Sequence, residues 1–136
     1  MLANKMVVVI AAEAPVGVAL NTAALLGVSL GHHHEDVVGA PVEDASGAVH
    51  EGMSAHPIPV LRASGEQLRD LRDQAAGRDG VTVHDMNQVA QRSRTYEQYT
   101  ATIGGTKKED LEYFGLGLYG PRAAVDSLTG ALALYR

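Results

Sequence analysis

Residues 5–31 read KMVVVIAAEAPVGVALNTAALLGVSLG, and this stretch decides the fold of the chain. Met6 to Ala12 is a continuous apolar run whose three consecutive valines favour a strand buried on both faces of a sheet. Pro15 and Gly17 then break the strand. From Val18 to Leu30 the chain is apolar on nearly all sides of a predicted helix, which is typical of a helix packed against neighbours on most sides. The stretch therefore predicts a central strand, a turn and a buried helix.

The length and composition of the chain limit the classes of protein to which it can belong. The 136 residues suffice for one domain with its own core, so we expect a single domain over residues 1–136. Cysteine is absent, which excludes a disulfide framework and a thiolate metal site. No apolar run approaches the roughly 20 residues that span a bilayer, and no basic segment precedes the first apolar run. We therefore expect a cytoplasmic protein without a membrane partner.

The formal net charge of -5 argues against a nucleic-acid partner, because affinity for nucleic acid rests mainly on Lys and Arg contacts to phosphates. A local basic patch stays open, and its members would be Arg62, Arg69, Arg72, Arg92, Arg94, Lys107 and Lys108.

Two polar features of the first helix invite a functional interpretation. Asn21 lies in its first turns, where it could bond a ligand beside free backbone amides or simply satisfy a neighbouring loop. His32, His33 and His34 follow near the expected helix end at Gly31. Imidazole is a common metal ligand, but adjacent residues point in different directions, which favours a solvated helix end. We therefore predict no metal centre and no cofactor, with the three histidines as weak candidates.

The middle of the chain predicts alternating strands and helices. We expect a peripheral hairpin over 36–54, a sheet-edge strand over 58–62 and a helix that Ser64 caps and that ends near Ala76. A strand over 81–83 then leads into one polar helix over 88–103.

Asp85 lies where that strand gives way to the helix, and ligand sites collect at this position in open α/β sheets. The alternative is that Asp85 caps the helix, since aspartate is a preferred N-cap residue.

The final segment, residues 110–136, reads DLEYFGLGLYGPRAAVDSLTGALALYR. It predicts a Gly-rich strand, a Gly-Pro turn, a short helix over 123–128, a Thr-Gly turn and a closing strand. This tail resembles the C-terminal signature of type 2 peptidyl-tRNA hydrolases. The segments KMVVVI, APVGVALNTAALLGVSLG, VVGAPVEDASGAVHEGMSAHPIPVL and LTGAL, in this order, resemble the bacterial domain of unknown function 2000 family over nearly the whole chain. The resemblance implies an α/β fold, a three-layer α/β/α sandwich with a mixed β-sheet of the type 2 peptidyl-tRNA hydrolase-like kind, paired as a homodimer.

The chain departs from the hydrolases at their active site. Those enzymes carry Met-Gly-Lys-Gly-Lys after the first strand, and Val18 occupies the position of its first lysine, which is part of the active site. Valine supplies neither a cation nor a proton donor. The hydrolase aspartate falls near Asp85 or Asn87, but Gln88-Val89-Ala90-Gln91 replaces the Ala-Gly-Arg-Thr that follows it, and the next segment is longer, with room for an extra helix. We therefore do not expect peptidyl-tRNA hydrolysis.

Two functions of different class remain. In the first, a pocket near the first strand-helix loop binds or converts a small molecule, and its candidate lining residues are Glu13, Asn21, His56, Asp85 and Asn87. In the second, the chain is a noncatalytic dimeric interaction module, since a fold alone licenses no chemistry. Peptidyl-tRNA hydrolase or RNA-binding activity ranks third. Convergence of Asn21, His56 and Asp85 on one concavity distinguishes the first function from the second.

Overall fold

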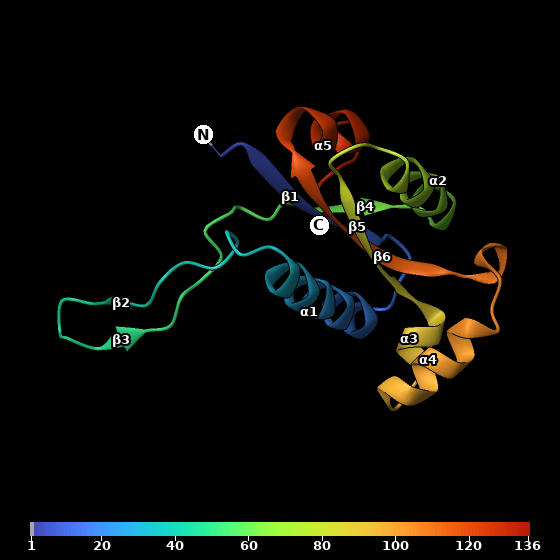
Figure 1. The fold of residues 1–136 in the computed structure, drawn as a ribbon, viewed down its shortest axis with the longest axis horizontal. Helices are drawn as coiled ribbons and strands as arrows, with labels where there is room; N and C mark the ends of the chain where they lie inside the picture. Colours follow the sequence, from blue (N-terminus) through green and yellow to red (C-terminus); the bar gives the residue numbers. More distant parts are fainter. Residues whose placement is uncertain (1) are drawn as a thin grey trace.

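The computed structural model describes residues 2–136, and a mixed sheet of four strands lies at its centre (Figure 1). The strand order is β4-β1-β6-β5. Strand β1 (Asn4–Ala11) pairs in parallel with β4 (Val60–Ala63) and antiparallel with β6 (Tyr113–Pro121). Strand β5 (Thr82–Asn87) closes the sheet antiparallel to β6. The carboxyl ends of β1, β4 and β5 therefore share one end of the sheet.

Helices cover both faces of this sheet. The long helix α1 (Val16–His33) packs on one face, while α2 (Gly65–Ala76) and α5 (Arg122–Thr129) pack on the other. Along β1, Met6, Val8 and Ile10 join the core under α1, and Val7, Val9 and Ala11 join the core under α2 and α5. The prediction of a central strand buried on both faces is confirmed, because successive side chains of a strand point to opposite faces.

The capping pattern located α2 correctly. The Ser64 hydroxyl accepts a hydrogen bond from the Gln67 amide at 3.1 Å, and the Gln67 side chain accepts one from the Ser64 amide at 2.9 Å. The helix ends at Ala76, as predicted.

Three predicted elements differ most from the structure. Helix α1 continues past Gly31 to His33. The predicted single helix over 88–103 is wrong, because it divides into α3 (Gln88–Arg92) and α4 (Tyr96–Gly104). The predicted closing strand is also wrong, since only an isolated bridge joins Leu134 to Leu61. A short 3-10 helix, η1 (Lys108–Asp110), precedes β6.

The predicted hairpin is confirmed and projects away from the body of the molecule (Figure 1). Its strands are β2 (Val42–Glu43) and β3 (Val49–His50), which pair antiparallel apart from the main sheet. At the tip, the Asp44 carboxylate accepts hydrogen bonds from the Ser46 amide at 2.9 Å and the Ala48 amide at 3.0 Å. Gly47 has a φ of 82°, a conformation that glycine adopts without strain. We call residues 38–54 the arm.

Within residues 2–136, the helices are all too short or too polar to cross a membrane.

Candidate functional site

The structure separates the five residues that the sequence suggested for one pocket. Asp85 and Asn87 lie at the carboxyl end of β5. His56 precedes β4 and therefore lies at the opposite end of the sheet. There its ring lies near that of Tyr119, with the two ring centroids 6.0 Å apart. Glu13 and Asn21 are exposed to solvent, and neither lines the cleft at Asp85 that is described below. The prediction of one pocket lined by all five residues is therefore wrong, because the start of β4 and the carboxyl end of β5 lie at opposite ends of the sheet. Asn21, His56 and Asp85 do not converge on one concavity, which by the criterion above counts against that pocket and in favour of an interaction module. A binding site at Asp85 therefore has to rest on the residues that the structure itself places there.

His56 holds the base of the arm in place. Its side chain is buried, and Nε2 lies 3.1 Å from Oδ2 of Asp36. The Tyr119 hydroxyl donates to the same carboxylate at 2.7 Å. This hydrogen bond from Tyr119, and to a smaller extent the contact with His56, lower the pKa of Asp36 below its usual value. The three side chains join the two ends of the arm to strand β6.

The three consecutive histidines lie at the carboxyl end of α1 beside β5. The His34 ring stacks on Tyr119 with ring centroids 3.8 Å apart, and its Nε2 lies 3.2 Å from the Thr82 hydroxyl. His84 Nδ1 lies 2.8 Å from the Ser29 hydroxyl. In the described part of the chain, no group of three or more His, Asp or Glu side chains is arranged to hold a metal ion.

Asp85 and Asn87 form the part of the predicted site that the structure brings together. Asp85 lies inside β5, so the alternative that it caps a helix is wrong. Asn87 caps α3 instead, since its Oδ1 accepts from the Ala90 amide at 3.1 Å. The fully buried Asn87 side chain also donates through Nδ2 to Oδ2 of Asp85 at 2.8 Å. The rigid start of α3 thus fixes the orientation of the Asp85 carboxylate.

Asp85 lines a cleft of about 390 Å³ between α1, β5 and the α3–α4 region, which we call the Asp85 cleft. Leu25 of α1 and Ala90 of α3 give it apolar surface. The other residues that line it, from the α3–α4 connection and α4, are Ser93, Arg94, Thr95, Tyr96 and Tyr99. Burial and the nearby charge of Asp85 raise the pKa of the Tyr99 phenol, so the phenol stays protonated at neutral pH.

The bend between α3 and α4 presents the residues at the rim of this cleft. Thr95 caps α4, because its hydroxyl accepts from the Gln98 amide at 3.1 Å. The Gln98 side chain in turn accepts from the Arg94 amide at 2.9 Å. Sequence reasoning missed Arg94, Tyr96 and Tyr99 as site residues. Thr95 followed three positions later by Gln98 was the signal that could have located a second helix start.

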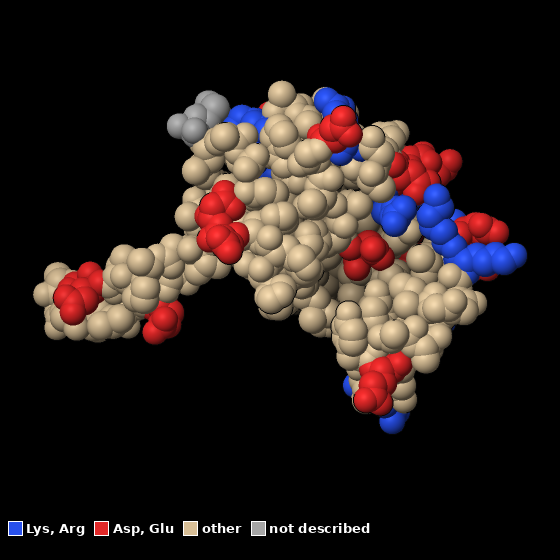
Figure 2. Space-filling view, in the orientation of Figure 1, with Lys and Arg blue, Asp and Glu red and all other residues tan. Residues whose placement is uncertain are grey.

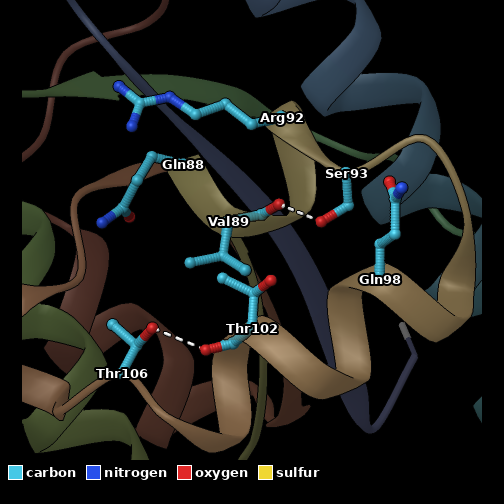
Figure 3. Close-up of a pocket in the computed structure, with 7 residues that line it drawn as sticks. All are labelled: Gln88, Val89, Arg92, Ser93, Gln98, Thr102 and Thr106. Atoms are coloured by element: carbon cyan, nitrogen blue, oxygen red, sulfur yellow. Dashed lines mark hydrogen bonds between the residues drawn. The ribbon is translucent and has the colours of Figure 1, made fainter.

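A second cleft, of about 510 Å³, lies on the other side of the bend (Figure 3). Its lining residues are Gln88, Val89, Arg92, Ser93, Gln98, Thr102 and Thr106. Two of its hydroxyls already donate to backbone carbonyls, Ser93 to Val89 at 2.7 Å and Thr106 to Thr102 at 2.7 Å. The Asp85 cleft differs in that a buried side chain, Asn87, orients a charged group that lines it, and this makes it the candidate site that we develop below.

Comparison with known proteins assigns the chain to a family. The family model described as Protein of unknown function (DUF2000) matches residues 4–136. The chain belongs to this family. A solved structure, that of the protein of unknown function Atu0240 from Agrobacterium tumefaciens strain C58, is similar to this DUF2000 protein with a TM-score of 0.91 and 22% identity, covering 100% of both chains. That similarity shows the fold alone. No curated protein matches the chain.

Proposed function

We propose that this DUF2000 protein binds a small molecule in the Asp85 cleft, and that the ligand presents a hydrogen-bond donor or a positive charge to Asp85. The proposal rests on one observation. The Asp85 carboxylate lines the cleft, and the buried Asn87 side chain orients it through a hydrogen bond. A volume of about 390 Å³ falls in the range of small-molecule sites.

The hydrogen bonds of Asp85 leave it free to accept from a ligand. Asn87 donates to Oδ2, and among the residues that the structure describes Oδ1 receives no hydrogen bond. A carboxylate has about four acceptor positions in its two oxygens, so most of them are available. Amines, amidines and ring N–H groups are donors that match this arrangement.

The aromatic side chains and the arginine narrow the class of ligand. The Tyr96 and Tyr99 rings lie 5.5 Å apart at an interplanar angle of 56°, and Tyr96 is 80% exposed. Such rings offer a face to a flat ring or to an organic cation. Arg94 lines the same cleft and can bind an anionic group. The best match is a heterocyclic amine that carries an acidic substituent.

A thermal-shift screen with nucleobases, nucleosides, nucleotides and aromatic amines tests the proposal. A ligand that binds the native state raises the melting temperature of the parent. The rise should disappear in Asp85→Asn, which keeps the size of the side chain and removes its charge. Asp79→Asn is the matched control, because Asp79 is exposed and lies outside the cleft, and it should keep the full rise. Equal shifts in all three proteins would contradict the proposal.

We also infer that the domain shares the type 2 peptidyl-tRNA hydrolase-like fold, as the sequence resemblance implies. The mixed sheet with helices on both faces supports this relationship, as does the Gly-rich β6 that leads through Pro121 into α5. Val18 lies in the first turn of α1, where the hydrolases place their lysine. The proposal is therefore one of ligand binding in a different cleft, without ester hydrolysis.

A further inference from the structure

We propose that a second copy of this chain covers the outer face of α1, and that the arm of each copy reaches the α3–α4 rim of the other. The outer face of α1 consists of the exposed residues Val16, Leu20, Ala24, Leu25 and Val28. The side chains of Val16, Leu20 and Val28 are 71%, 67% and 71% exposed. Four of these five residues follow one another at intervals of four, so they form one stripe along the helix.

The composition of α1 shows that this stripe is more than a few scattered apolar residues. The helix has 18 residues and none of them is Asp, Glu, Lys or Arg. A surface helix of a monomer normally carries charged residues opposite its buried stripe, whereas a helix apolar all round is one that is covered all round. The sheet covers only the face that contains Leu26 and Leu30. The other face is therefore suited to a protein partner.

The arm is a second exposed apolar feature, and it begins beside the same helix. Val38, Val42, Val49 and Met53 are all exposed, Met53 by 82%. An isolated two-stranded ribbon is only marginally stable in water, so a ribbon of this kind gains from contact with another surface. The Gly39 amide donates to the Met53 carbonyl at 2.8 Å, which joins the two strands of the arm near its base. Just outside the arm, Asp36 contacts His56 and Tyr119, and these contacts connect the base to β6. The arm therefore projects from a base that is held against the sheet.

Charge indicates what the arm contacts. The arm carries Glu43, Asp44 and Glu51, and the chain has no Lys or Arg between Lys5 and Arg62. Figure 2 shows acidic groups and no basic group on the projecting arm. Side by side, two arms would repel each other. A basic surface on the partner is favoured instead, because like charges in contact oppose association.

The arm and the α3–α4 region lie at opposite ends of α1, and these positions allow the arm of one copy to meet a basic surface of the other. The arm leaves from the side of its carboxyl end, whereas α3 and α4 lie toward its amino end (Figure 1). If two α1 helices pack antiparallel about a two-fold axis, each arm points toward the partner's α3–α4 region. Exposed residues there are the partner's Arg92, the partner's Arg94 and the partner's Tyr96, with only the partner's Glu97 of opposite sign. The acidic arm and this rim are complementary in charge.

The dimensions agree with this arrangement. At about 1.5 Å per residue, α1 is about 27 Å long. The eight residues 38–45 span about 26 Å when extended at about 3.3 Å per residue. The arm is therefore about as long as α1, so it can extend beyond the end of the helix toward a partner.

Sedimentation velocity of the full chain at micromolar concentrations tests the proposal. The parent should be a dimer, and Leu20→Glu should be a monomer, because the substitution places two like charges in the apolar interface. Gln74→Glu is the matched control, since it adds the same charge to the exposed surface of α2, and it should stay dimeric. Circular dichroism checks that each variant is folded. A monomeric parent overturns the proposal, as does a Leu20→Glu variant that dimerises as tightly as the parent.

A charge exchange tests the contact between the arm and the rim. Glu43→Lys should raise the dissociation constant of the dimer about two- to thirtyfold, the effect of two exposed ion pairs, because the two-fold axis repeats the contact. Adding Arg94→Glu in the same chain should return the dissociation constant to that of the parent. The two positions again carry opposite charges, because both signs have been exchanged. Additive weakening in the double variant would show that the arm does not contact this rim, and would overturn that part of the proposal. Leu25, Arg94 and Tyr96 also line the Asp85 cleft, so in this dimer the partner's arm would lie at the edge of that cleft. The sedimentation experiments use the protein without added ligand, and their outcome is therefore distinguishable from that of the thermal-shift screen.

Discussion

Replacing Thr22 with valine should stabilise the protein. Thr22 is fully buried in α1, and within the described residues its hydroxyl has no hydrogen-bond partner. Its Cγ2 methyl lies against β6, where a Cβ built at Gly115 would be only 2.6 Å away. A buried polar group without a partner costs about 1–3 kcal/mol, and replacing it with an apolar group of the same shape removes that cost. We therefore expect Thr22→Val to raise the free energy of unfolding by about 1–2 kcal/mol.

The measurement is urea denaturation followed by circular dichroism, with thermal unfolding in parallel. For a chain of this size, 1 kcal/mol corresponds to a shift in melting temperature of about 3–4 °C. The midpoint should rise while the denaturant slope stays constant, because the compactness of the two states does not change.

Thr129 supplies the matched control. It is equally buried in a helix, but its hydroxyl donates to the Val125 carbonyl at 2.8 Å. Thr129→Val should therefore lower stability by about 1 kcal/mol, the net contribution of one hydrogen bond. If both substitutions destabilise the protein equally, the Thr22 hydroxyl has a partner in solution and the reasoning is refuted.

Three further predictions use other parts of the chain. Ser64→Ala removes the cap of α2 and should lower the free energy of unfolding by about 1 kcal/mol in the same denaturation assay. Burial lowers the pKa of His34 and His84 below the ordinary 6.5, so the unfolded chain binds protons first, and the melting temperature should fall as pH drops through 6.5. A pH-independent melting temperature there would contradict this. Neither the parent nor Val18→Lys should cleave labelled peptidyl-tRNA, and cleavage by the parent would contradict this prediction.

Local signals in the sequence located the elements that short-range chemistry determines. The valine run of β1 and the Ser64–Gln67 capping pattern of α2 each predicted an element that the structure confirms. The same capping rule, applied to Thr95 and Gln98, predicts the start of α4. Polar residues continue through the break between α3 and α4, which is why their pattern predicts one helix over 88–103. Only the Thr95 cap indicates that a second helix begins there.

The candidate site was predicted less well, because it depends on which strands are neighbours. Asp85 and Asn87 are two residues apart in one strand, so their proximity follows from the chain itself. His56 precedes β4, and its distance from Asp85 depends on a parallel pairing of β4 with β1 that sequence periodicity does not specify. Tyr96 and Tyr99 reach the cleft only because the chain bends at Ser93–Thr95, a turn without glycine or proline to indicate it.

Helix α1 shows why one sequence pattern has two structural explanations. Apolar residues on all sides predict that the helix is covered on all sides, yet the sheet covers only the face with Leu26 and Leu30. Hydrophobicity measures the tendency of a side chain to leave water, and it does not specify whether the same chain or a second copy provides the cover. The pattern alone predicts burial and does not identify the covering surface, and in the structure Leu20 and Val28 are exposed. If Leu20→Glu remains folded and becomes monomeric, the same residues that predicted a buried helix will have predicted the dimer.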